Sequence, residues 1–173
     1  MLNFIQNGEG GARPLLIAHG LFGSARNWGV LSKRLSENRP VIAVDMRNHG
    51  SSPHLPTQSY FDMAADLAEV IKAHGGQADV LGHSMGGKAA MILALQDPDL
   101  VAHLVVADIA PVAYDHTQLH LIDAMQAVDL ENISSRRDAE AALLDLVPEA
   151  GVRAFLLQSL DLKGDRPRWA FNL

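Results

Sequence analysis

The chain has 173 residues, of which 48% are hydrophobic and 20% charged, and its formal net charge is -6. This composition is that of a globular domain with enough apolar side chains for a core, and it excludes a disordered chain. The acidic balance argues against nucleic acid or an anionic membrane as a partner, and no apolar run approaches the roughly 20 residues that span a bilayer. Because the N-terminus has no basic start or long apolar stretch and cysteine is absent, we expect a cytoplasmic protein without disulfides.

From residue 15 to residue 107, short apolar runs alternate with amphipathic runs. The apolar runs predict buried parallel strands at Leu15–Ala18, Val41–Val44, Asp79–Leu81 and Val101–Ala107. The amphipathic runs predict crossover helices at Arg26–Ser36, Phe61–His74 and Lys88–Gln96. This alternation is typical of an α/β fold whose mostly parallel sheet is covered by helices on both faces.

After Pro111 the pattern changes. Three helical stretches follow one another, at Thr117–Val128, Arg136–Val147 and Val152–Leu160, and then a short strand-like run, Trp169–Leu173. Three consecutive helices do not extend a parallel sheet. We therefore expect a core in residues 1–111, a helical region in 112–168, and the start of a return to the core in 169–173.

The segment Gly82-His83-Ser84-Met85-Gly86-Gly87 lies between a predicted strand and a predicted helix. This is the layout of a nucleophile elbow, in which a tight turn exposes a serine hydroxyl at a helix N-terminus. Strand and helix approach so closely that side chains two residues before and after the serine would clash, and glycine stands at both positions. Ser84 is therefore the predicted nucleophile.

A second motif, His19-Gly20-Leu21-Phe22-Gly23, follows the first predicted strand. Acyl transfer passes through an oxyanion, which two preorganised backbone N–H groups can stabilise. We assign these groups to Leu21 and to Met85, the residue after the nucleophile. His19 precedes the loop, so we expect its ring to bond the backbone rather than to act as the base.

With a third stretch, Asp45-Met46-Arg47-Asn48-His49-Gly50-Ser51-Ser52, these motifs resemble the signature segments of α/β-hydrolase fold esterases. The resemblance is closest to the small bacterial esterases related to abhydrolase-domain-11 proteins, in which Asp-Ile-Ala-Pro-Val follows the strand after the elbow, here Asp108–Val112. It runs through all 173 residues and is strongest from His19 to Val112. It implies an α/β-hydrolase fold in which residues 112–168 form a helical lid over the active-site mouth.

Asp108 is the best candidate for the acid of a catalytic triad. It ends the strand after the elbow, where sites of parallel sheets assemble, and the resemblance favours the same position. The alternative is a turn aspartate that accepts backbone N–H bonds. Asp45 is expected to be structural, forming with Arg47, Asn48 and His49 a hydrogen-bonded turn that supports the oxyanion loop.

The triad histidine is missing. In this fold it follows the last strand, but no histidine follows His120. We therefore interpret the sequence as the N-terminal two-thirds of a hydrolase, whose sheet is completed by a missing C-terminal segment or by a second copy. The alternative is a natural short form with His83 or His116 as a substitute base.

These residues predict a carboxylic-ester hydrolase in which Ser84 forms an acyl-enzyme that water hydrolyses, without a cofactor or metal. The substrate would be a small acyl ester or thioester. Its candidate contacts are Phe22, His83, Leu119, Ile122 and Phe155, although apolar lid residues can equally pack internally. Acyl thioesterase or lactonase activity stays open, as does a non-catalytic ligand sensor or an inactive fragment. A dehalogenase or epoxide hydrolase is disfavoured, because those enzymes use aspartate where Ser84 stands.

Overall fold

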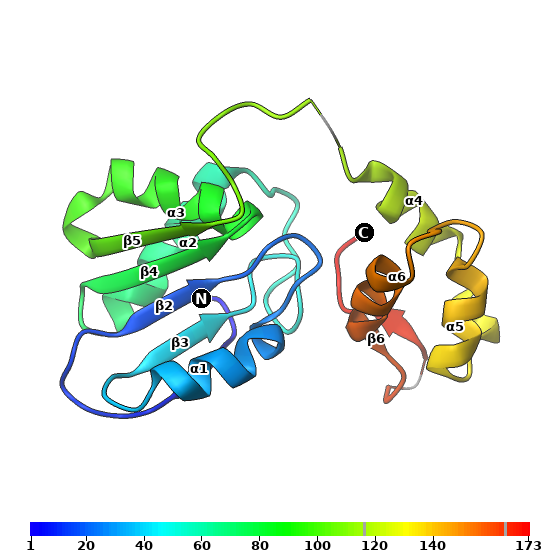
Figure 1. Cartoon of the computed structure of the whole chain (residues 1–173), viewed down its shortest axis with the longest axis horizontal. Helices are drawn as coiled ribbons and strands as arrows, with labels where there is room; N and C mark the ends of the chain where they lie inside the picture. Colours follow the sequence, from blue (N-terminus) through cyan, green and yellow to red (C-terminus); the bar gives the residue numbers. More distant parts are fainter. Residues whose placement is uncertain (116, 165) are drawn as a thin grey trace. The chain divides into compact units, whose positions relative to one another are not determined.

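The computed structural model describes residues 1–115, 117–164 and 166–173. These residues form two compact units, Met1–Pro111 and Val112–Leu173 (Figure 1). Each unit has its own buried side chains and is described by itself below.

The first unit is built on a five-stranded sheet in the order β1-β3-β2-β4-β5. Its strands are β1 (Phe4–Asn7), β2 (Leu15–Ala18), β3 (Val41–Val44), β4 (Ala78–His83) and β5 (Val101–Ala107). β1 is antiparallel to β3, and the remaining pairs are parallel. The positions of the four predicted strands are confirmed, with β4 longer than expected, whereas β1 was not predicted. The expectation that Val101–Ala107 is buried is wrong, because β5 is the last strand of the sheet and none of its residues is fully buried.

Helices cover both faces of this sheet. The 3-10 helix η1 (Ala25–Trp28) and α1 (Gly29–Leu35) replace the single predicted helix on one side. The other side carries α2 (Tyr60–Ala73) and α3 (Met85–Gln96), and the short helix η2 (Pro98–Leu100) leads into β5.

Successive side chains of β2 and β3 point to opposite faces of the sheet. Leu16 and Ile42 pack with α2 and α3, whereas Leu15 and Val41 pack with Ala25 of η1. Because both faces are covered, the strands read as continuous apolar runs rather than alternating ones. Fully burying each Leu or Ile side chain stabilises the fold by about 1.5–3 kcal/mol.

The strand order places the ends of β2 and β4 side by side. From β2 the chain crosses through α1 to β3 on one side, then through α2 to β4 on the other. Parallel sheets bind ligands at such a switch point, outside the carboxyl ends of the strands. Ala18 of β2 is paired with Gly82 of β4, so the loops that follow both strands lie next to each other.

In the second unit the described residues form α4 (Leu119–Ala127), η3 (Leu130–Asn132), α5 (Arg136–Leu143), α6 (Ala150–Leu156) and η4 (Leu157–Ser159). A short hairpin pairs β6 (Leu160–Asp161) with β7 (Arg168–Trp169). The three predicted helices are present, but α5 ends four residues before the predicted Val147. The third is divided into α6 and η4 and stops before Leu160, which belongs to β6. Residues 169–173, expected to begin a return to the core, belong here to the second unit, where the Trp169 indole N–H donates to the Met125 carbonyl at 3.0 Å.

Candidate active site

Ser84 lies on a strained turn between β4 and α3. Its backbone has φ 49° and ψ −116°, a combination that costs a non-glycine residue about 1–3 kcal/mol and that clusters at functional sites. The surrounding glycines permit the turn. A Cβ on Gly82 would stand 2.5 Å from the Gly86 carbonyl oxygen, and one on Gly86 would collide with the carbonyl oxygens at the end of β2. The elbow layout expected from the sequence is thus present in the backbone.

The loop after β2 runs directly beside this turn. A Cβ on Gly20 would stand 2.9 Å from His83 Nδ1 and 3.1 Å from the Ser84 Cβ, so a larger residue there would require these neighbours to shift. Within the loop, the Gly23 N–H donates to the Gly20 carbonyl at 3.0 Å, which closes a tight turn over Leu21 and Phe22. Phe22, the third residue of this turn, has φ 60° and is 8% exposed.

The Gly20 carbonyl fixes the direction of the Leu21 N–H. Its oxygen accepts from the Gly23 N–H and from Nδ1 of His19 at 2.7 Å. Because carbonyl and N–H of one trans peptide point in opposite directions, the Leu21 N–H is turned away from the interior of the loop. The Met85 N–H is the first of α3 and has no acceptor within its helix. In the described part of the chain, neither N–H donates a hydrogen bond, which leaves both available to an oxyanion.

Two buried neutral histidines support the loop. His19 Nε2 accepts from the Met46 N–H at 2.9 Å, so the proton is on Nδ1. His49 Nε2 accepts from the Phe22 N–H at 3.3 Å, while its Nδ1 donates to the Arg47 carbonyl at 2.8 Å. Burial, with a further contribution from the neighbouring His49, lowers the pKa of His19 to about 4, and burial likewise lowers the pKa of His49. As expected, the His19 ring bonds the backbone.

The Asp45 carboxylate holds the far end of the same loop. It accepts from the backbone N–H groups of Ala25 at 2.8 Å and Ser51 at 2.9 Å, and from the Asn3 side chain at 2.8 Å. Its carboxyl group fills the space that a side chain on Gly50 would need. These contacts confirm that Asp45 belongs to a hydrogen-bonded turn, and its support of an oxyanion hole stays a prediction.

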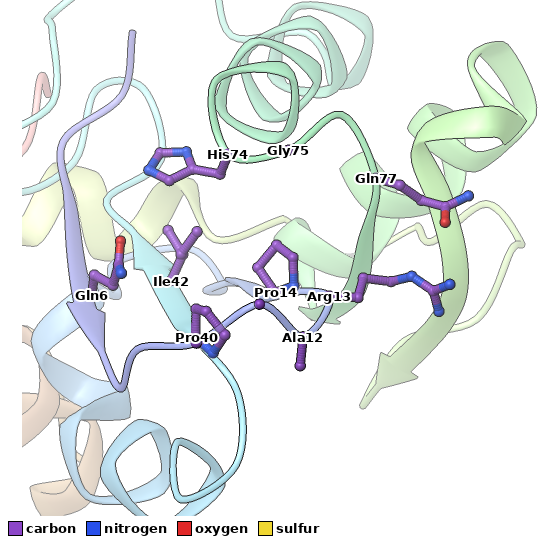
Figure 2. Close-up of a pocket in the computed structure, with 11 residues that line it drawn as sticks. Gln6, Ala12, Arg13, Pro14, Pro40, Ile42, His74, Gly75 and Gln77 are labelled. Atoms are coloured by element: carbon purple, nitrogen blue, oxygen red, sulfur yellow. The ribbon is translucent and has the colours of Figure 1, made fainter.

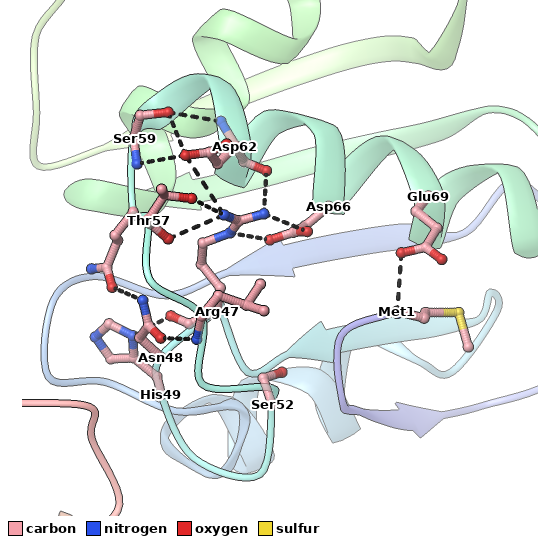
Figure 3. A network of polar contacts seen from close by, with 12 residues as sticks. Met1, Arg47, Asn48, His49, Ser52, Thr57, Ser59, Asp62, Asp66 and Glu69 are labelled. Atoms are coloured by element: carbon pink, nitrogen blue, oxygen red, sulfur yellow. Dashed lines mark hydrogen bonds and ion pairs between the residues drawn. The ribbon is translucent and has the colours of Figure 1, made fainter.

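Arg47 fastens the loop after β3 to α2 (Figure 3). Its Nε and one terminal nitrogen bond both carboxylate oxygens of Asp66, at 2.6 and 2.9 Å, and this hydrogen bonding raises the pKa of the guanidinium. The other terminal nitrogen reaches the carbonyl and hydroxyl of Thr57. A paired, bidentate guanidinium of this kind holds the loop in one geometry.

Asp108 follows β5 and lies opposite Ser84 across the pair β4–β5. The Ser84 N–H donates to the carbonyl of Ala107, the residue before Asp108, at 2.9 Å. Asp108 has φ 57°, and its side chain is 85% exposed. Its carboxylate lies 3.6 Å from Nε2 of His83. His116, one of the two alternative bases, lies outside the described residues.

The lid candidates divide by burial. Leu119 is 58% exposed and Phe155 36%, while Ile122 is half-buried. Met125, Leu143 and Leu156 are fully buried within the second unit. The exposed residues stay available for substrate contacts, and the lid itself remains a prediction.

One contact near the elbow had no signal in the sequence. The Gln58 side chain donates to the sulfur of Met85 at 3.7 Å and accepts from the Asn48 side chain at 2.9 Å. Gln58 lies in the irregular segment before α2, and only the folded chain brings it to the elbow.

A pocket of about 490 Å³ lies at the opposite edge of the sheet (Figure 2). Its lining includes Arg13 and Pro14 before β2, Pro40 before β3, and Gln77 before β4. It therefore opens at the amino ends of the strands, whereas Ser84 follows a carboxyl end. Within the described residues, no group of three or more His, Asp or Glu side chains is arranged to hold a metal, and no helix is long and apolar enough to cross a membrane.

Comparison with known proteins defines the class. The family of the alpha/beta hydrolase fold matches residues 13–164, and the chain belongs to this family. Among curated relatives, it is 42% identical over 176 residues to the sn-1-specific diacylglycerol lipase ABHD11 of Danio rerio, covering 96% of this chain and 56% of that protein. It is 42% identical over 163 residues to the esterase YbfF of Escherichia coli, covering 92% of this chain and 62% of that protein.

A solved structure agrees. A marine microorganism esterase superposes with a TM-score of 0.92 at 40% identity, covering 99% of this chain and 68% of that one. The chain thus spans a little over half the length of the curated relatives it matches. The fold and the family expected from the sequence are confirmed, and the relatives' names support a hydrolase of the esterase type.

Proposed function

We propose that this chain carries the nucleophile, the acid and the oxyanion hole of a carboxylic-ester hydrolase. Ser84 Oγ attacks the acyl carbonyl, the alcohol leaves, and water then releases the acid from the acyl-enzyme. The observation that carries the proposal is the strained Ser84 backbone, flanked by glycines and facing the loop of Leu21. Strain of this size persists only where the surrounding structure enforces it.

In this mechanism the N–H groups of Leu21 and Met85 bind the oxyanion of the tetrahedral intermediate. Removing one such donor costs an acyl-transfer enzyme about 10²- to 10³-fold in kcat. Both groups lack a competing acceptor within the described residues, and Met85 adds the positive end of the α3 dipole. No cofactor enters the reaction.

The base is proposed to be a histidine from polypeptide outside these 173 residues, oriented by Asp108. The Asp108 carboxylate is exposed beside Ser84, where it can receive an imidazole N–H. The same polypeptide, or a second copy of the chain, would cover β5, the last strand in the sheet order, whose Val105 is 54% exposed. The greater length of the curated relatives supports this view.

The substrate is proposed to be a small acyl ester. The relatives' names, diacylglycerol lipase and esterase, both describe cleavage of a carboxylic ester. In the first unit the candidate contacts are Phe22, in the turn after β2, and His83, the residue before the nucleophile. Leu119, Ile122 and Phe155 of the second unit stay candidates from the sequence. Thioester or lactone cleavage would use the same groups, so a thioester with the same acyl chain serves as the comparison substrate.

The test uses the full-length gene product with a p-nitrophenyl ester and a fluorophosphonate probe. Ser84→Ala should abolish labelling and lower kcat by about 10⁴-fold or more. Ser36→Ala, which removes a hydroxyl that donates to the Lys33 carbonyl of α1, is the matched control and should behave like the parent. Equal labelling of the parent and Ser84→Ala would refute the proposal.

A further inference from the structure

The turn that carries the Leu21 N–H has an unfavourable residue at its third position. The bond from the Gly23 N–H to the Gly20 carbonyl makes this a β-turn with Leu21 and Phe22 at its centre. Phe22 has φ 60°, and Leu21 is not among the described residues with positive φ. This combination defines a type II turn, whose third position normally takes glycine because a side chain is strained there.

A simple rearrangement would relieve that strain. Rotating the central peptide, which consists of the Leu21 carbonyl and the Phe22 N–H, converts a type II turn into a type I turn and returns Phe22 to negative φ. Since nothing in the local sequence favours the strained form, a contact from elsewhere must hold it.

His49 provides that contact. Its Nε2 accepts from the Phe22 N–H, and its Nδ1 carries the ring proton, which it donates to the Arg47 carbonyl. In the rotated turn, the Leu21 carbonyl oxygen would face an unprotonated ring nitrogen, so two acceptors would meet. The ring cannot easily turn away, since it is 3% exposed and lies edge-on against His19 with centroids 5.1 Å apart.

We propose that His49 is a positioning residue of the oxyanion hole, which holds the Leu21–Phe22 peptide in the strained orientation and ties the turn that carries the Leu21 N–H to the loop after β3. The inference rests on the proposed function. A preorganised donor must be held within about 0.5 Å of its working position. The Gly20 carbonyl sets the direction of the Leu21 N–H within the turn, whereas the bond from the Phe22 N–H to His49 anchors the turn itself. His49 acts through the loop and does not itself touch substrate.

Asn48, the residue before His49, connects the same loop to Met85. Asn48 donates to the Gln58 side chain, which in turn donates to the Met85 sulfur. From two adjacent positions, the loop after β3 therefore contacts the Phe22 backbone directly and the Met85 side chain through Gln58.

Two substitutions test the hydrogen bonds of the two His49 ring nitrogens independently. In His49→Gln, the amide oxygen can stand where Nε2 stands and accept from the Phe22 N–H, while the donor to Arg47 is lost. In His49→Asn, the amide nitrogen can stand near Nδ1 and keep the bond to Arg47, while the acceptor for Phe22 is lost. A merely structural role does not favour the first variant over the second in kcat.

The experiment measures kcat and KM on the full-length gene product. His74→Asn is the control, because the His74 ring also bonds a backbone carbonyl but lies far from the elbow. His49→Asn should lower kcat by about 10- to 100-fold with little change in KM, and His49→Gln should recover most of the loss. The loss in His49→Asn should shrink in a Phe22→Gly background, because glycine adopts φ 60° without strain.

Equal kcat values for the Asn variant and the parent would overturn the proposal, as would a folded His49→Gln variant that has lost kcat by tenfold or more. The second outcome is decisive even if His49→Asn does not fold. Ser84→Ala is assayed alongside. If it stays active, the proposed function fails, whereas an inactive Ser84→Ala with a fully active His49→Asn refutes only the role of His49.

Discussion

Acidification should destabilise the first unit through His19. In the folded chain the pKa of His19 is about 4, because burial and the neighbouring His49 disfavour the charged ring. In the unfolded chain a histidine titrates near 6.5. Between these two values the unfolded chain binds a proton that the folded chain does not, so the free energy of unfolding falls as the pH falls.

The size of the effect follows from the shift. Lowering the pKa by roughly 2.5 units corresponds to about 3 kcal/mol, lost progressively from pH 6.5 to pH 4 and not further below it. A domain of this kind has about 5–15 kcal/mol of stability in total. The contribution of His19 is therefore large enough to measure.

The assay is urea unfolding followed by fluorescence of Trp28, in a Trp169→Phe background so that the signal reports on the first unit. The matched variant is His19→Gln, whose amide can still accept from the Met46 N–H but does not titrate. Between pH 7 and pH 4.5, the parent should lose about 2–3 kcal/mol more than the variant. His49 is present in both proteins, so its own titration cancels. Parallel pH profiles would show that the reasoning about His19 is wrong.

Two further substitutions test the site. Asp108→Asn should lower kcat by roughly 10³- to 10⁴-fold and leave Tm unchanged, because the exposed carboxyl orients a histidine; a fall in Tm with unchanged kcat would instead indicate the turn role. Gly86→Ala should destabilise the fold by several kcal/mol, since its Cβ would meet two backbone carbonyl oxygens, whereas Gly151→Ala in the open space along α6 should raise stability by up to about 1 kcal/mol. Thermal melting compares the two, and similar Tm values would contradict the close-approach argument.

Local rules explain why the elbow could be predicted from the sequence. The turn requires glycine two residues before and after Ser84 for steric reasons. The six residues Gly82–Gly87 are therefore enough to recognise the motif. β2 and β3 are likewise visible as uninterrupted apolar runs, since they are buried on both faces. β1 (Phe4–Asn7) was missed because it is a short edge strand with both middle residues exposed, which leaves no apolar run or alternation to detect.

The contacts around the oxyanion loop depend on the tertiary fold. The structural role of Asp45 could be expected, because its segment resembles a known motif. The hydrogen-bond partners of its carboxylate could not be predicted. Two contacts follow only from the placement of β2, β3 and β4 side by side: His49 accepts from the Phe22 N–H, and Gln58 donates to the Met85 sulfur. The strand-like run predicted at Trp169–Leu173 overlaps β7, but β6 and its pairing with β7 were missed, because a two-residue strand has no period to detect.

The central claim is that Ser84 becomes acylated during turnover. The most direct measurement is rapid acid quenching of the full-length gene product during hydrolysis of p-nitrophenyl acetate, followed by mass spectrometry of the intact protein and of its peptides. We predict one added acetyl group, located on the peptide that contains Ser84 and absent from Ser84→Ala. Turnover that continues with the acetyl group on another residue, or undiminished turnover in Ser84→Ala, would contradict the account.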